Sequence, residues 1–181
     1  MSSQLEKIND GQIVEYTRDQ IELLKQTVCK GSSDSELQMF MYVCKHTGLD
    51  PFLKQIYSIS RGNVRTNQTS IDGYRLTAER TKRYMPGREP TFTYDNAGNL
   101  VKATAYIKKL DSQGVWHEIS ASALFNEYNP GNNAIWKKMP HTMLAKCAET
   151  LVIRKGFPAE LSGVYTKEEM DLLLNALKEF E

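Results

Sequence analysis

Apolar residues recur every three or four positions in two separate segments of the first part of the chain. The first such segment follows Thr17, whose side chain is suited to an N-cap, and stops at Gly31. The second follows Ser33 as N-cap and ends at Gly48, just before the helix-breaking pair Asp50-Pro51. The pattern therefore predicts two amphipathic helices.

A β region is predicted next by a change to alternating polar and apolar positions. Residues Gln55–Ser60 alternate and lead into Arg61-Gly62-Asn63, a typical hairpin turn. Three later runs with strand composition are separated by turns that contain Asn, Asp and Gly, which predicts an antiparallel meander. These runs are Thr91–Tyr94, Leu100–Ile107 and Val115–Ala121.

Helical spacing is found again between and after these strands. Asp72–Tyr84 is predicted to be a short charged helix, and Asn126–Asn133 a loop. A longer helix is expected within residues 136–158, with Pro140 in its first turn, and Lys167–Glu179 forms a last amphipathic helix. The order predicts an α+β fold in which a small antiparallel meander and a hairpin pack with helices.

Composition supports one globular domain over residues 1–181. The chain has 181 residues, of which 40% are hydrophobic, enough for a single core. No apolar run approaches the roughly 20 residues that span a bilayer, and the N-terminus lacks the layout of a signal peptide. We therefore expect no membrane association and a cytoplasmic location.

The net charge of +1 conceals a strong asymmetry along the chain. Residues 1–44 carry 4 Lys/Arg and 7 Asp/Glu, a net charge of −3. Residues 45–109 carry 12 and 5, a net charge of +7, and residues 110–181 carry 7 and 10, again −3. A basic middle suits an anionic partner, and acidic flanks beside it suit contacts between copies of the chain.

Motifs of catalysis and cofactor binding are missing from the sequence. It contains no G-x-x-x-x-G-K-[ST] and no G-x-G-x-x-G, so we expect no ATP and no other cofactor. Its three cysteines and three histidines lack metal-ligand spacing, and each cysteine is predicted to be a small buried residue. Asp50 and Asp72 are the candidates for a Mg²⁺-dependent nuclease, although a turn and a helix start explain them locally. Mg²⁺ is not required by any motif, and we predict no catalytic residue.

The helix after Pro140 carries a stripe of polar side chains. Lys146, Thr150 and Arg154 recur every fourth residue and share a sector about 80° wide, away from the apolar face. Two cations and a hydroxyl on one stripe could hold successive phosphates, and a solvated helix face is the alternative interpretation. Further candidate contacts lie before or outside this stripe, namely Arg75, Lys137, Lys138 and His141.

Four stretches in this order resemble the Redβ/RecT family of single-strand annealing proteins, the family of the phage recombination protein Bet. They are T-G-L-D-P-F-L-K-Q-I-Y (47–57), S-I-D-G-Y-R-L-T-A-E-R-T (70–81), W-K-K-M-P-H-T-M-L-A-K-C-A-E-T-L-V-I-R-K-G-F-P (136–158) and E-L-S-G-V-Y-T-K-E-E-M (160–170).

The resemblance implies a Rad52-like annealing core and an ATP-independent protein of DNA recombination and repair. Such a protein binds single-stranded DNA and the annealed duplex in a basic groove of a homo-oligomer, a ring or a helical filament. The family's DNA-contacting basic positions fall on Lys54, Arg61, Lys146 and Arg154. His141 and Cys147 stand where the better-known phage member has lysine.

The resemblance also implies a setting, a phage-infected cell or bacterial host. Longer relatives carry a C-terminal module that recruits a 5′→3′ exonuclease and a single-strand-binding protein. We expect that module to be absent, so neither partner is assumed. If the stripe binds DNA, replacing Lys146 or Arg154 by alanine should weaken binding without unfolding the protein. The alternatives are the metal-dependent nuclease and a self-assembling, non-enzymatic scaffold without affinity for nucleic acid.

Overall fold

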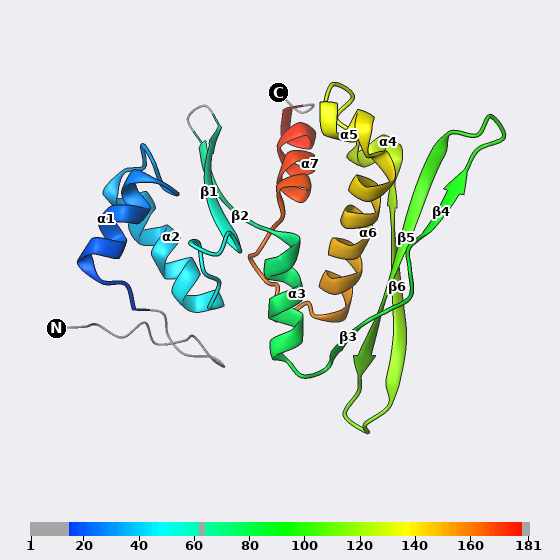
Figure 1. The fold of residues 1–181 in the computed structure, drawn as a ribbon, viewed down its shortest axis with the longest axis horizontal. Coiled ribbons are helices and arrows are strands. Elements are labelled where there is room, and N and C mark those ends of the chain that lie inside the picture. The colour runs from blue at the N-terminus through cyan, green and yellow to red at the C-terminus, as the bar shows by residue number, and fades with distance from the viewer. Residues whose placement is uncertain (1–14, 62–63, 179–181) are drawn as a thin grey trace. The chain divides into compact units, whose positions relative to one another are not determined.

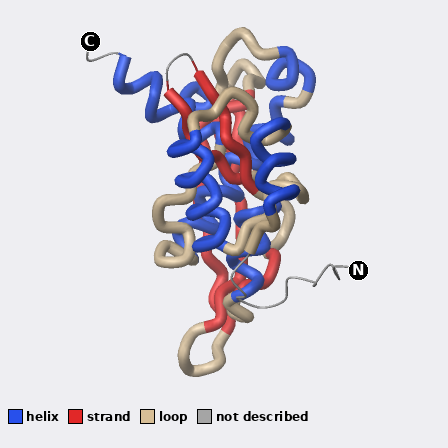
Figure 2. The backbone as a smooth tube through the Cα atoms, turned by 90° about the vertical axis from the view of Figure 1, so that its left-hand side faces the viewer, coloured by secondary structure: helices blue, strands red, loops and turns tan. Residues whose placement is uncertain are grey.

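The computed structural model of the chain describes residues 15–61 and 64–178, in two compact units (Figures 1 and 2). The first unit ends at Gly73 and the second begins at Tyr74. Helices and antiparallel strands come in separate groups along the chain, which confirms the predicted α+β class, whereas the single domain over 1–181 stays a prediction. The elements are α1 (Arg18–Gln26), α2 (Asp34–Thr47), β1 (Ile56–Arg61), β2 (Val64–Thr69), α3 (Ile71–Arg80), β3 (Tyr84–Pro86), β4 (Thr91–Tyr94), β5 (Leu100–Leu110), β6 (Trp116–Leu124), α4 (Phe125–Tyr128), α5 (Ala134–Lys138), α6 (Pro140–Gly156) and α7 (Lys167–Lys178).

The two N-terminal helices begin where the sequence indicates. Thr17 and Ser33 are their N-caps, and each forms a reciprocal capping box with the side chain three positions later, Gln20 or Glu36. α2 ends at Gly48, whose φ of 64° is left-handed and therefore suits a residue without a Cβ atom. Both predicted helix starts are confirmed.

The predicted hairpin is confirmed by the pairing of β1 with β2. The two strands are antiparallel, from Ile56 opposite Thr69 to Arg61 opposite Val64. The turn itself, residues 62–63, lies outside the described residues. The Ile56 side chain of this unit is buried, which fixes the face of β1 that points inward.

The second unit is built around β5, the longest strand. β6 pairs with it along one edge, and the short strands β3 and β4 pair with opposite ends of its other edge. The meander of β4, β5 and β6 is confirmed, although β5 continues to Leu110 and β6 runs from Trp116 to Leu124. These shifts of a few residues are usual for strand ends.

Three predicted boundaries differ from the structure. The first helix, expected to continue to Gly31, ends at Gln26. The helix expected over Asp72–Tyr84 ends at Arg80, because Tyr84 pairs with Lys109 and starts β3. The expected loop Asn126–Asn133 begins with the helical turn α4. A three-residue strand has no local signature of its own, since its only reason to be extended is the partner strand that the fold brings beside it.

α6 covers one face of this sheet (Figure 1). The strand positions beneath it are mostly small, and Ala103, Ala105 and Ile107 of β5 are all buried. Gly156 at the end of α6 lies so close that an added Cβ would be 2.9 Å from Cδ1 of Ile107. α6 is therefore the central helix of the unit, and its sides are more buried than those of a surface helix.

Candidate nucleic-acid interface

The helix expected within residues 136–158 is divided in two. α5 ends at Lys138 and α6 begins at Pro140, and Met139 between them has φ −135° and ψ 57°. Proline lacks an amide hydrogen and disfavours a helical conformation in the residue before it, which explains the break. Pro140 occupies the first turn of α6, as predicted.

α5 is anchored on one side and charged on the other. Trp136 is buried and packs edge-on against Phe125, with ring centroids 6.0 Å apart. Lys137 and Lys138 are exposed, and neither forms an ion pair with any described residue. Of the predicted contacts, these two lysines are available to an external anion without any rearrangement.

His141 in the first turn of α6 meets two aromatic residues of β4. Its Nε2 lies 2.9 Å from the hydroxyl oxygen of Tyr94, and its ring lies edge-on to Phe92 at 5.0 Å. The imidazole nevertheless remains exposed. The sequence predicted His141 as a contact, and the structure adds the two rings against which it is held.

The polar stripe of α6 is not a free surface. Thr150 is only 2% exposed, and its hydroxyl donates to the carbonyl oxygen of Lys146 at 3.0 Å. The Lys146 ammonium group lies 3.0 Å from a carboxylate oxygen of Glu168 in α7, and 32% of its side chain is exposed. Thr150 is therefore placed inside the fold, contrary to the expected solvent-facing stripe, because α6 is covered on that side too.

Arg154 lies at the centre of a hydrogen-bonded network within the second unit. Its Nε and Nη2 atoms donate to the two carboxylate oxygens of Glu169 at 2.8 and 3.1 Å, and Nη1 donates to the carbonyl oxygen of Leu161 at 3.1 Å. Nη2 also contacts the hydroxyl of Tyr74 and the carbonyl oxygen of Val164. The guanidinium group thus joins α3, α6, α7 and the segment before α7.

Glu169 accepts hydrogen bonds from three residues. Besides binding Arg154, its carboxylate accepts a hydrogen bond from the backbone amide of Thr166 at 2.8 Å. The Thr166 hydroxyl in turn accepts a hydrogen bond from the backbone amide of Glu169, so the two residues form the capping box of α7. Burial alone would raise the pKa of Glu169, but the hydrogen bonds from Arg154, Thr166 and Tyr74 hold it below its ordinary value. The carboxylate is thereby kept charged beside the guanidinium group.

The first unit holds two further candidates. Lys54 is exposed in the turn after α2, has a left-handed φ of 59°, and its ammonium group has no partner among the described side chains. Arg61 ends β1, and its side chain lies outside the described residues. Arg65, by contrast, is engaged internally with the carbonyl oxygen of Lys30 and the carboxylate of Glu36.

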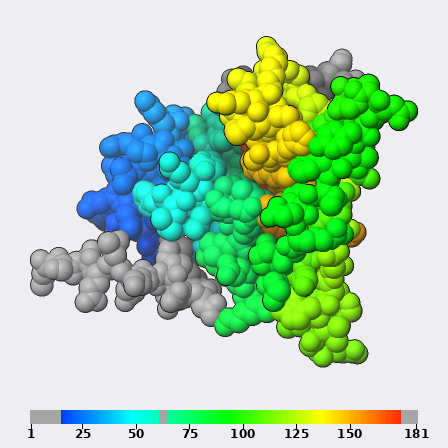
Figure 3. Space-filling model, turned by 45° about the vertical axis from the view of Figure 1, so that its right-hand side comes forward, coloured from blue at the N-terminus to red at the C-terminus, as the bar shows by residue number. Residues whose placement is uncertain are grey.

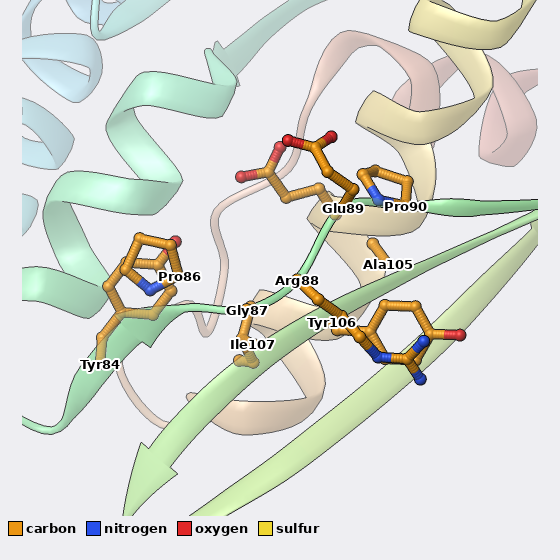
Figure 4. A pocket seen from close by; sticks show the side chains of 10 residues that line it. Tyr84, Pro86, Gly87, Arg88, Glu89, Pro90, Ala105, Tyr106 and Ile107 are labelled. Atoms are coloured by element: carbon orange, nitrogen blue, oxygen red, sulfur yellow. The ribbon is translucent and has the colours of Figure 1, made fainter.

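Two arginines of the second unit are already engaged near β3. The Arg75 side chain forms a two-point contact with the Glu149 carboxylate in α6, both distances being 2.7 Å. Arg88 lies 3.5 Å from the ring centroid of Tyr106 and forms a salt bridge with Glu118, and the hollow around it is lined by the β3–β4 connection (Figure 4). Arg75 would have to exchange a carboxylate for a phosphate to contact DNA.

A metal-dependent nuclease would need a cluster of metal ligands. Among residues 15–61 and 64–178, no three His, Cys, Asp or Glu side chains come together to form one. Asp50 accepts the amide hydrogens of Phe52 and Leu53, so it stabilises a turn, as the sequence indicated. Cys29, Cys44 and Cys147 are buried, as predicted. Burial raises the pKa of the Cys147 thiol, which opposes a nucleophilic role.

Sequence reasoning missed three residues that organise this region. Tyr74 and Glu169 hold Arg154, and Tyr94 holds His141. A signal for Glu169 was present, because Thr166-Lys-Glu-Glu169 has the spacing of a capping box. No comparable local pattern marks Tyr74 or Tyr94, whose partners are distant in the sequence.

No helix of the described residues is long and apolar enough to cross a membrane.

Comparison with known proteins identifies the family of this chain. No curated protein matches the chain. The model of the RecT family matches residues 15–179, nearly its whole length, in agreement with the four stretches that resemble that family. The chain therefore belongs to the RecT family, whose members are single-strand annealing proteins of DNA recombination.

Proposed function

We propose that this protein binds single-stranded DNA and anneals it to a complementary strand without ATP or another cofactor, as a non-enzymatic step of recombination. The observation that carries the proposal is membership of the RecT family over residues 15–179. The absence of a phosphate-binding loop from the sequence agrees with nucleotide independence. Annealing needs no bond to be broken, only the offsetting of repulsion between two phosphate backbones.

Accessible polar side chains are the proposed DNA contacts. Lys54, Lys137 and Lys138 are exposed and suited to meet phosphates directly, and His141 is an exposed contact beside the two α5 lysines. Lys146 is proposed as a contact that exchanges the Glu168 carboxylate for a phosphate, since part of its side chain is exposed. Contacts to the backbone leave base edges free to test pairing. Binding releases counterions, so affinity should fall with salt.

Other predicted contacts take a different place in the proposal. Arg154 and Thr150 act as positioning residues that fix α6 and α7, because their polar atoms are already engaged inside the second unit. Arg75 contributes if it leaves Glu149. Arg61, at the end of β1, is retained as a contact because the family resemblance assigns it.

A homo-oligomer is part of the proposed mechanism. One copy is expected to contact only a few phosphates, so tight binding requires many copies along one strand, each raising the effective concentration of the next. The acidic flanks and basic middle of the sequence suit such head-to-tail contacts. A ring and a helical filament both satisfy this requirement. The annealed duplex is the expected product.

The decisive experiment follows complementary fluorescent oligonucleotides in the absence of nucleotide. We expect the protein to accelerate annealing, and electron microscopy to show rings or filaments on DNA. Assembly without DNA binding would favour the scaffold instead. Cleavage of labelled DNA in Mg²⁺, abolished by Asp72→Ala, would favour the nuclease. Normal annealing by Lys137→Ala/Lys138→Ala would contradict the assignment of those contacts.

A further inference from the structure

Three aromatic rings meet where β4 reaches the start of α6. Phe92 and Tyr94 are two residues apart on β4, and the pairing with β5 shifts register between Thr93 and Tyr94. Both contact His141: Phe92 edge-on at 5.0 Å between ring centroids, and Tyr94 at 6.0 Å with an interplanar angle of 48°. The 2.9 Å hydrogen bond between the Tyr94 hydroxyl and His141 fixes the two rings relative to each other. We call these three residues the aromatic cluster.

The aromatic cluster is open to solvent although it is mostly apolar. Half of the Tyr94 surface (50%) is exposed, and His141 is exposed beside it. The adjoining segment adds apolar surface, since Ile135 is 52% and Met139 45% exposed. In Figure 3 this segment, in yellow, adjoins the bright green end of β4 and β5. An exposed group of rings on a rigid strand and helix is suited to a planar partner.

Positive charge lies next to the aromatic cluster. Lys137 and Lys138 precede His141 by four and three residues, which places them within about 15 Å of it along the chain. Both ammonium groups are unpaired among the described residues. Asp95, which follows Tyr94 directly in the sequence, stabilises a turn, because its carboxylate accepts hydrogen bonds from the backbone amides of Ala97 and Asn99. Cations beside exposed rings match a strand with anionic phosphates and flat bases.

We propose that Tyr94 and His141 form a stacking site for an unpaired nucleobase, with Lys137 and Lys138 binding the adjoining phosphates. The inference rests on the proposed function and assigns to it the residues that touch a base. Stacking is tolerant of sequence because every base has a π face. In a duplex each base is already stacked between its neighbours, so the site selects the unpaired strand and is vacated when pairing is complete.

The test separates stacking from charge by using two DNA ligands. One is an ordinary single-stranded oligonucleotide, and the other an abasic strand of the same length with the same number of phosphates. We expect Tyr94→Ala to weaken binding of the ordinary strand by about 5- to 100-fold and leave binding of the abasic strand unchanged. Tyr94→Phe, which keeps the ring and loses the hydroxyl, should retain most of the affinity.

Matched variants provide the controls. Trp116→Ala removes another exposed aromatic side chain, 39% exposed at the far end of β6, and should leave both affinities unchanged. Lys137→Ala/Lys138→Ala should weaken binding of both strands and flatten the salt dependence. Fluorescence of the buried Trp136 reports whether each variant is folded.

The outcomes distinguish this inference from the proposed function. If the wild type binds DNA and Tyr94→Ala binds the ordinary strand equally well, the stacking site is refuted while annealing stands. Equal losses on ordinary and abasic strands, or a Tyr94→Phe variant as weak as Tyr94→Ala, also contradict stacking. If the wild type binds neither strand, the proposed function itself fails.

Discussion

Arg154 is the residue whose expected role changes most. In the sequence it is the last cation of a phosphate-binding stripe, yet in the structure its guanidinium group bonds with Glu169, Tyr74 and two backbone carbonyls. Removing one partner of a largely buried ion pair leaves the other charge uncompensated. Loss of DNA binding in an Arg154 variant would therefore mix a structural effect with a lost contact.

We predict that Arg154→Ala destabilises the protein by about 2–4 kcal/mol, because it removes the bidentate partner of Glu169 and leaves a carboxylate whose side chain is only 11% exposed without its cation. Urea denaturation of the wild type and variant measures the difference in the free energy of unfolding. Lys138→Ala, which removes an exposed and unpaired cation, should change it by less than about 0.5 kcal/mol. Equal stabilities for the two variants would contradict the structural role of Arg154.

Glu169 predicts how stability depends on pH. Its pKa in the folded protein lies below the ordinary value of 4.5, so the folded state binds this proton less readily than the unfolded state. Its contribution is then complete above about pH 4.5 and is lost as pH falls through the lowered folded pKa. Unfolding free energies of wild type and Glu169→Gln should differ most at neutral pH and converge in acid. Parallel curves, or convergence in the exposed control Glu160→Gln as well, would contradict this prediction.

The sequence predicted candidate residues better than it predicted the partners that surround them in the structure. The sequence identified Lys137, Lys138 and Arg154 as candidates, since charge is visible in a linear pattern. It could not show that Arg154 has Tyr74 beside it, because that contact joins positions 80 residues apart. Helical spacing placed Thr150 away from the apolar face, but α6 is buried on that side as well.

At the scale of elements, the β3–β4 connection lies directly on β5 at Gly87. A Cβ atom at this position would be 2.3 Å from the carbonyl oxygen of Tyr106 and 2.5 Å from its carbonyl carbon. Backbone atoms of a central strand cannot move aside as a side chain can. The glycine is therefore required by close approach, and it keeps β3 and β4 on the same edge of the sheet.

We expect Gly87→Ala to destabilise the protein by about 2–3 kcal/mol through this overpacking. Gly156→Ala is the matched control, because the nearest atom to its added Cβ is a side-chain methyl carbon of Ile107 at 2.9 Å. That methyl group can rotate away, so the control should lose less. Thermal melts of both variants measure the difference, and a Gly156→Ala variant less stable than Gly87→Ala would contradict this reasoning.

Elements with local signals were predicted closely, and elements without them were not. Thr17, Ser33 and Gly48 mark helix ends through their own caps, so both helix starts and the end of α2 were placed correctly, whereas α1 ends at Gln26, before the predicted stop at Gly31. β3 is extended only because it pairs with β5, and the sequence therefore predicted its first residue, Tyr84, as the end of a helix. Pro140 was placed in the first turn of α6, whereas the separate α5 depends on the buried anchor Trp136.

At the scale of the whole molecule, the basic middle of the sequence is less available than its charge suggests. Arg65, Arg75 and Arg88 each contact a carboxylate within the protein. The free cations of the second unit include Lys137 and Lys138, which belong to the acidic C-terminal part of the sequence. Net charge per segment thus predicted an anionic partner without identifying the residues that meet it.

The salt dependence of DNA binding measures how many cations of the protein contact phosphates. Each phosphate neutralised on a single strand contributes about −0.7 to the slope of log affinity against log salt concentration. If one protomer engages about four phosphates, through residues such as Lys54, Lys137, Lys138 and Lys146, the slope per protomer should be near −3. Lys137→Ala/Lys138→Ala should then reduce its magnitude by about 1.4.

Arg88→Ala is the matched control for this titration, because it removes a cation that is already engaged with Tyr106 and Glu118. Its slope should equal that of the wild type. Fluorescence anisotropy of a labelled oligonucleotide from low to high salt gives all three slopes at a fixed number of protomers per strand. An unchanged slope in the double lysine variant would show that the lysines of α5 do not contact phosphates. An affinity that does not depend on salt would exclude an electrostatic groove altogether.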